Sequence, residues 1–143
     1  MSTANLHETL LNYALRRNAL NIEITNLQSQ KTLATYSQAD AMSLKNAKDR
    51  EAKEYFKKLY EDDPELQEKY TDYTQIPDFE DEIDKIVAEY NDQLAELTAW
   101  ETAIDAQITT DSAELEEITA YMESLKSMLS SNIQNDYNYG LNS

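Results

Sequence analysis

The 143-residue sequence predicts an all-α fold, a long antiparallel helical hairpin with coiled-coil-like packing in a single domain, 1–143. Two observations support it. Apolar residues recur at helical spacing over long stretches, and both prolines, Pro64 and Pro77, lie together near the middle of the chain. The alternative is a compact four-helix bundle with additional breaks near Ser37 and Asp111.

The first arm is predicted to run from residue 5 to residue 60. Asn5 and Glu8 have capping-box spacing, which marks a helix start. An apolar row then follows at alternating steps of four and three, interrupted at Arg17: Leu6, Leu10, Tyr13, Leu20, Ile24 and Leu27, continued by Ala34, Ala41, Ala52, Tyr55 and Leu59. The sequence SQAD at 37–40 is also compatible with a new helix start, which is why the four-helix alternative stays open.

The bend is predicted over residues 61–78. Asp63 followed by Pro64 is typical of an N-cap and first helical position, and predicts a short helix over 64–70. The segment 71–77 has no period, and Asp78 is expected to cap the second arm. Four acids crowd the first turns of that arm, where the helix dipole favours negative charge: Glu80, Asp81, Glu82 and Asp84. The acids therefore indicate a bend rather than a metal site.

The second arm, 79–135, carries one heptad register from Ile83 to Leu129. Its two rows are Val87, Leu94, Glu101, Ile108, Leu115, Met122 and Leu129, and Ile83, Tyr90, Leu97, Ile104, Asp111, Ile118 and Leu125. Such a repeat predicts left-handed supercoiling of packed helices. Asp111 and Glu114 have capping-box spacing, but the register survives them, so a helix continuous through Asp111 is favoured. The tail, 136–143, is expected to follow a helix stop near Gly140.

Charge is distributed unequally between the arms. Residues 1–60 carry nine Lys/Arg and six Asp/Glu, a net charge of +3. Residues 61–143 carry three Lys and 22 Asp/Glu, a net charge of −19. A basic cluster precedes the bend and an acidic cluster follows it: Lys45, Lys48, Arg50, Lys53, Lys57 and Lys58, and Glu80, Asp81, Glu82, Asp84, Glu89 and Asp92. We expect these clusters to face each other and to set helix direction, although each exposed pair contributes at most about 1 kcal/mol.

The residues that enzymes and metalloproteins use are scarce. The chain has no cysteine, one histidine, His7, and one glycine, so thiol chemistry, a glycine-rich phosphate loop and an EF-hand loop are excluded. His7 is expected to be an exposed or interfacial helix residue. We therefore predict no catalytic residues, no cofactor and no metal, and a protein that is not an enzyme. The net charge of −16 disfavours direct nucleic-acid binding.

The sequence predicts a structural or assembly protein that acts by helix–helix packing with itself. The alternative is an acidic adaptor or chaperone-like module for a basic protein partner. The expected partner is thus a second copy of the chain, or another helical or basic protein. Trp100, beside Glu101, either turns into the core or faces a partner. No signal peptide or membrane span is apparent, which leaves a cytoplasmic protein or one exported or packaged without a cleavable leader. The predicted interface residues are Leu20, Ile24, Leu27, Val87, Tyr90, Leu94, Leu97, Trp100, Ile104, Ile108, Leu115, Ile118, Met122 and Leu125.

Overall fold

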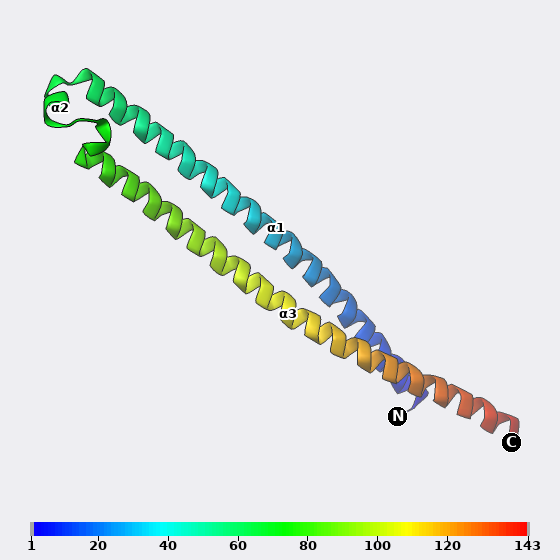
Figure 1. Ribbon diagram of the computed structural model, residues 1–143. Helices are drawn as coiled ribbons and strands as arrows, with labels where there is room; N and C mark the ends of the chain where they lie inside the picture. The colour runs from blue at the N-terminus through cyan, green and yellow to red at the C-terminus, as the bar shows by residue number, and fades with distance from the viewer. Residues whose placement is uncertain (1, 143) are drawn as a thin grey trace. The chain divides into compact units, whose positions relative to one another are not determined.

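The computed structural model describes residues 2–142, and their side chains up to residue 139. The elements in chain order are α1 (Thr3–Asp62), α2 (Pro64–Lys69), the 3-10 helix η1 (Tyr73–Gln75) and α3 (Pro77–Asn142) (Figure 1). Helices α1 and α3 pack against each other, and residues 2–142 contain no strand. The predicted all-α helical hairpin is confirmed. Both long helices are continuous through Ser37 and Asp111, so the four-helix alternative is wrong.

The chain divides into two compact units. The terminal unit comprises Met1–Lys31 and Ala103–Ser143, and the bend unit comprises Thr32–Thr102. Each unit contains one stretch of α1 and one stretch of α3, so each has its own seam between two helices.

Both long helices begin earlier than the sequence pattern predicts. The backbone N–H of Asn5 donates to Ser2 Oγ at 3.2 Å, so Ser2 caps α1 and Asn5 lies inside the helix. Helix α3 begins at Pro77, which suits a first helical position because proline has no N–H to satisfy. Asp78 is consequently a first-turn residue and not the cap, and the Phe79 N–H donates to the Ile76 carbonyl at 3.0 Å.

The end of α3 also differs from the prediction. The helix passes through Gly140 to Asn142, so residues 136–142 are helical, whereas a separate tail was expected from residue 136. A glycine inside a helix costs only about 1 kcal/mol relative to alanine, and no proline follows to stop the helix. The last residue of the predicted tail, Ser143, lies outside the described residues.

Hydrogen bonds fix the bend. Asp63 Oδ1 accepts from the Glu65 N–H at 2.9 Å, which confirms the predicted cap of α2. The Tyr60 hydroxyl lies 2.9 Å from the carbonyl oxygens of both Tyr70 and Thr71. The Gln67 side chain donates to the carbonyls of Tyr60 and Glu61, each at 3.0 Å, and so satisfies the last turn of α1.

An apolar cluster lies beneath these hydrogen bonds. Phe56, Ile76 and Phe79 are buried, and five partly buried side chains pack against them: Tyr60, Leu66, Tyr70, Tyr73 and Ile83. The ring centroids of Phe56 and Phe79 are 5.5 Å apart, and those of Tyr73 and Phe79 are 5.4 Å apart, both edge to face. The tyrosines and prolines of residues 60–77 thus build the bend.

The cap at Asp63 is expected to contribute measurably to stability. Asp63→Ala removes the side-chain acceptor of the Glu65 N–H, so we expect the free energy of unfolding to fall by about 1 kcal/mol. Urea denaturation followed by circular dichroism measures the change. Asp62→Ala removes the same charge one residue earlier without touching this cap. Equal losses in the two variants would contradict a capping role.

The seam shifts its register close to the bend. The sequence pattern selects Val87, Tyr55 and Leu59, whereas the structure buries Ile86 and Phe56 and leaves Tyr55 and Leu59 exposed. The inward residues of α3 follow steps of three and four except at Ile86, Tyr90 and Leu94, where two steps of four adjoin. Such an insertion locally unwinds the supercoil, so a heptad count extended across it selects the wrong residue. The three predicted core alanines are buried as expected: Ala34, Ala41 and Ala52.

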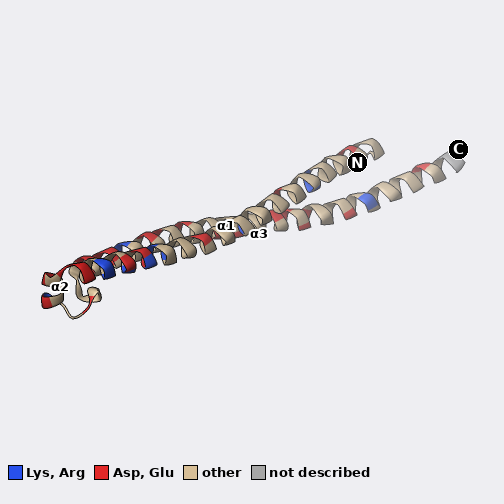
Figure 2. Ribbon diagram, turned by 90° about the horizontal axis from the view of Figure 1, so that it is seen from above, with Lys and Arg blue, Asp and Glu red and all other residues tan. Residues whose placement is uncertain are grey.

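An ion pair between Lys48 and Glu89 joins the basic and acidic clusters. Lys48 Nζ lies 3.1 Å from Glu89 Oε2, so the two helices of the bend unit are joined by a basic and an acidic residue, as predicted. Figure 2 shows basic and acidic residues interspersed along the stretches of the two long helices nearest α2. Lys45 instead pairs with Asp49, four residues along its own helix, at 3.0 Å. Its ammonium also lies 6.0 Å from the centre of the Tyr90 ring.

Candidate interaction surfaces

Most of the predicted interface residues lie along the seams between α1 and α3. Leu20 is fully buried and forms a cluster with Ile118 and Met122, against which Leu115 also packs. Ile104 is buried as well. Eight others are half-buried: Ile24, Leu27, Val87, Tyr90, Leu94, Leu97, Ile108 and Leu125. Leu20, Leu115, Ile118 and Met122 pack together within the chain. A role for the predicted set in contacting another molecule stays a prediction.

Two acidic side chains occupy seam positions, as the heptad count indicates. Glu101 Oε2 accepts from Gln38 Nε2 at 2.9 Å, a hydrogen bond between α3 and α1 in the bend unit. Asp111 in the terminal unit is only 3% exposed. Its Oδ1 accepts from Gln107 at 2.9 Å, and its Oδ2 has no hydrogen-bond partner. Trp100 is 37% exposed, so it does not replace Glu101 in the seam.

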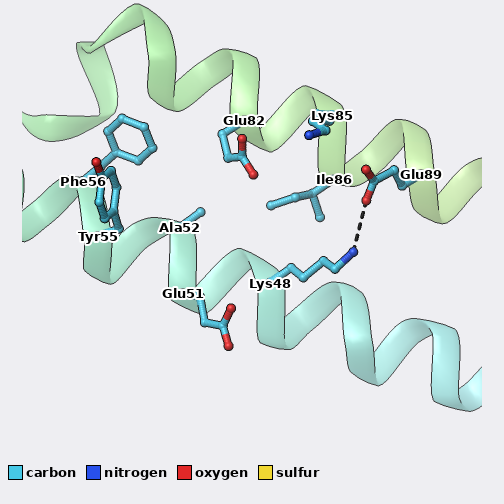
Figure 3. Close-up of a pocket in the computed structure, with 9 residues that line it drawn as sticks. All are labelled: Lys48, Glu51, Ala52, Tyr55, Phe56, Glu82, Lys85, Ile86 and Glu89. Carbon is cyan, nitrogen blue, oxygen red and sulfur yellow. Dashed lines mark hydrogen bonds and ion pairs between the residues drawn. The ribbon is translucent and has the colours of Figure 1, made fainter.

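A groove crosses the seam of the bend unit. It has a volume of about 490 Å³, and Ala52, Phe56 and Ile86 supply apolar lining. Figure 3 shows charged side chains around it, with Lys48 joined to Glu89. The full lining is Lys48, Glu51, Ala52, Tyr55, Phe56, Glu82, Lys85, Ile86 and Glu89. The groove thus combines an apolar floor with two cationic and three anionic side chains.

The terminal unit has a second groove, of about 390 Å³, over two tyrosines. The ring centroids of Tyr13 and Tyr121 are 5.8 Å apart, and the Tyr121 hydroxyl donates to Glu117 Oε1 at 2.8 Å. Beside them, Arg16 binds Glu114 through two nearly parallel hydrogen bonds of 2.9 and 3.0 Å. This two-point contact fixes the arginine more firmly than a single ion pair would.

These contacts shift three pKa values. The hydrogen bond from Arg16 lowers the pKa of the Glu114 carboxyl, and the same bond raises the pKa of Arg16. The hydrogen bond to Glu117, together with its negative charge, raises the pKa of Tyr121. The Glu114 carboxyl therefore stabilises the folded state at pH values above its unfolded-state pKa. This contribution is lost as the pH falls through its folded-state pKa.

Removal of the guanidinium is expected to reverse the Glu114 shift. In Arg16→Gln, the pKa of Glu114 should rise toward the ordinary carboxyl range, because the largest cause of its depression is gone. Carboxyl carbon chemical shifts recorded during an acid titration measure this value. Arg17→Gln removes the neighbouring cation and serves as the control. A Glu114 pKa that is the same in Arg16→Gln as in the unmodified protein would refute the assignment.

The predicted interface set omits several exposed apolar side chains of α1. Leu11, Ile22, Leu33, Leu44 and Tyr55 are 47–64% exposed. They recur at intervals of eleven residues, which is close to three helical turns, so successive members differ little in angle around the helix. Leu15 and Tyr36 are also more than half exposed. We call these seven residues the outer stripe. An eleven-residue count would have found it, whereas the heptad count selects only the seam.

His7 is an exposed residue of α1. No group of three or more histidines, cysteines and acids is placed to hold a metal ion among residues 2–142. In the same range, none of the helices has the length and apolarity needed to cross a membrane. Comparison with known proteins gives no match to a family model, to a curated protein or to a solved structure.

Proposed function

We propose that this protein is a non-enzymatic structural subunit that assembles by helix–helix packing with copies of itself. The observation that carries the proposal is the outer stripe. Single exposed apolar residues are ordinary on protein surfaces, and the support for assembly is that seven large ones, 47–65% exposed, occur along one helix. The seam occupies the other apolar side of α1, where Leu6 and Leu20 are fully buried.

Self-association is tested by light scattering and sedimentation over a concentration series at low and high salt. We expect the mass to rise with concentration. Added salt should preserve or strengthen association, because it screens the mutual repulsion of chains that each carry −16. A monomeric mass at every concentration and salt level would refute this function.

A second function is favoured by the charge of α3. Residues 61–143 carry a net −19, and α1 cations pair with Glu89, Asp105 and Glu114 among the described side chains. The acids that crowd the start of α3 are exposed: Asp78, Glu80, Asp81, Glu82 and Asp84. A surface of this kind attracts a basic protein. The alternative proposal is therefore an acidic adaptor that binds such a partner.

The two functions respond to salt in opposite ways. A lysine-rich peptide is the probe for the adaptor, with a glutamate-rich peptide of equal length as its control. Titration calorimetry should show binding of the lysine-rich peptide alone, and the affinity should fall as salt is raised. Equal heats from both peptides, or an affinity that salt does not change, would remove the adaptor function.

A further inference from the structure

We infer that two copies of this chain pair side by side, parallel and in register, through a short row of residues on α1 in the terminal unit. The row consists of Leu11, Leu15, Asn18 and Ile22, and we call it the terminal row. All four residues belong to one helix within one compact unit. The inference rests on the proposed self-association and specifies its surface and direction.

The terminal row has heptad spacing and is exposed. Its members follow one another at steps of four, three and four residues, the spacing at which two helices pack along a common line. Leu11, Leu15 and Ile22 are 55%, 60% and 64% exposed, and Asn18 is exposed as well. At about 100° per residue, the four members lie within about 60° of one another around the helix.

The seam of the terminal unit occupies a different side of α1. Leu6 and Leu20 are fully buried, and Leu10 and Tyr13 pack against the cluster that contains Leu20. These four residues are centred about 150° around the helix from the terminal row. A second helix can therefore lie along the row without displacing the stretch of α3 that packs on the seam.

The positions beside the terminal row carry no charge. In coiled coils the flanking positions are often charged and set the choice of partner. Here they hold only asparagine and alanine: Asn12, Ala14, Ala19 and Asn21. The two arginines of this segment, Arg16 and Arg17, lie about 130° around the helix from the row. The alanines leave room for the close approach of a second helix.

The absence of acids favours a second copy of the chain as the occupant. Residues 9–22 contain no Asp or Glu, so a basic partner finds no carboxylate to pair with on this surface. Chains that each carry −16 repel each other wherever their acidic surfaces approach. Such repulsion is smaller at the terminal row than at the acid-rich start of α3. The row of one copy is thus an uncharged, partly apolar surface that matches the row of another.

Asn18 selects the direction of the pair. In a parallel pair in register, Asn18 lies opposite Asn18 of the second copy, and the two amides can each donate to and accept from the other. An antiparallel pair with Leu11 opposite Ile22 would set Asn18 against Leu15, where the amide has no partner. A buried polar group without a hydrogen bond is costly, and one polar residue in such a row can fix the register.

The surface is tested by substitution and sedimentation. Three apolar side chains per copy make a small interface, so we expect weak, reversible association. Leu15→Asp places a charge in the row and should raise the dissociation constant by about tenfold or more. Ile133→Asp adds the same charge at a similarly exposed residue of α3 in the same unit, and should leave the constant unchanged. Circular dichroism verifies that each variant is helical.

The direction is tested by cross-linking, because the chain has no native cysteine. Ile22→Cys chains should form disulfide dimers with one another under mild oxidation. A mixture of Leu11→Cys and Ile22→Cys chains should give few mixed dimers, because these residues lie about 16 Å apart along a parallel pair.

A charge at the end of the row gives a second test of direction. Glu8 lies one heptad before Leu15, so a parallel pair brings two Glu8 carboxylates together, whereas the antiparallel pair sets Glu8 against Thr25. Glu8→Gln should therefore strengthen association by about twofold. Predominantly mixed dimers, an unchanged constant in Glu8→Gln or unweakened association of Leu15→Asp would overturn this inference alone. A monomeric unmodified protein would overturn the proposed function with it.

Discussion

Phe56→Ala is expected to lower the free energy of unfolding by about 3–5 kcal/mol, as removal of a buried aromatic side chain usually does. Phe56 is only 7% exposed and packs with Ile76 and Phe79. Because it joins the end of α1 to the start of α3, its loss leaves a cavity where the two helices are held together. Small domains have about 5–15 kcal/mol of stability in total, so this single change removes a large part of it.

Urea denaturation followed by circular dichroism measures the effect. The control is Tyr55→Ala, because Tyr55 is the adjacent aromatic residue and is 63% exposed. Its ring contacts Phe56 edge to face at 5.1 Å, and such a pair is worth at most about 1.5 kcal/mol. A larger loss in Tyr55→Ala than in Phe56→Ala would contradict the observed register, and would favour the register that the heptad count predicts.

The register of the seam near the bend is the part of the fold that the sequence periodicity does not predict. Helix type, the position of the bend and the cap at Asp63 follow from local chemistry, and the sequence pattern identifies all three. The choice between Tyr55 and Phe56, or between Val87 and Ile86, depends on how the bend cluster rotates the adjoining helix turns. This rotation is a tertiary effect, and a heptad count carried across an insertion of four residues has no information about it.

The candidate surfaces were predictable to a smaller degree. A heptad pattern selects one apolar side of a helix, and it correctly identified Leu20, Ile104 and Ile118 as residues of the seam. The outer stripe has a different period, so a seven-residue count assigns its residues to different heptad positions. The two-point contact of Arg16 with Glu114 depends on the alignment of residues 98 apart in the sequence, which no local pattern contains.

Asp111→Leu is expected to raise the free energy of unfolding by about 1–3 kcal/mol, which is the cost of burying a polar group without a hydrogen bond in proteins. Asp111 is 3% exposed at a heptad position, and its Oδ2 has no hydrogen-bond partner. A leucine side chain of similar length would place apolar surface at this buried position of the seam. Gln107, which donates to Oδ1, is itself exposed and can donate to water in the variant.

Two comparison variants separate charge from burial. Asp92→Leu removes an exposed acid of the same helix, and should change stability by no more than about 0.5 kcal/mol. Asp111→Asn keeps the shape of the side chain but removes its negative charge. If Asp111→Leu destabilises the protein while Asp111→Asn does not, the polar group itself is needed at this position. Buried polar residues at such positions of coiled coils can fix register and oligomeric state at a cost in stability. If Asp111→Leu is more stable and its mass in light scattering also changes, Asp111 selects the native assembly. If Asp111→Leu is more stable and its mass is unchanged, the seam tolerates the acid and Asp111 has no role in assembly.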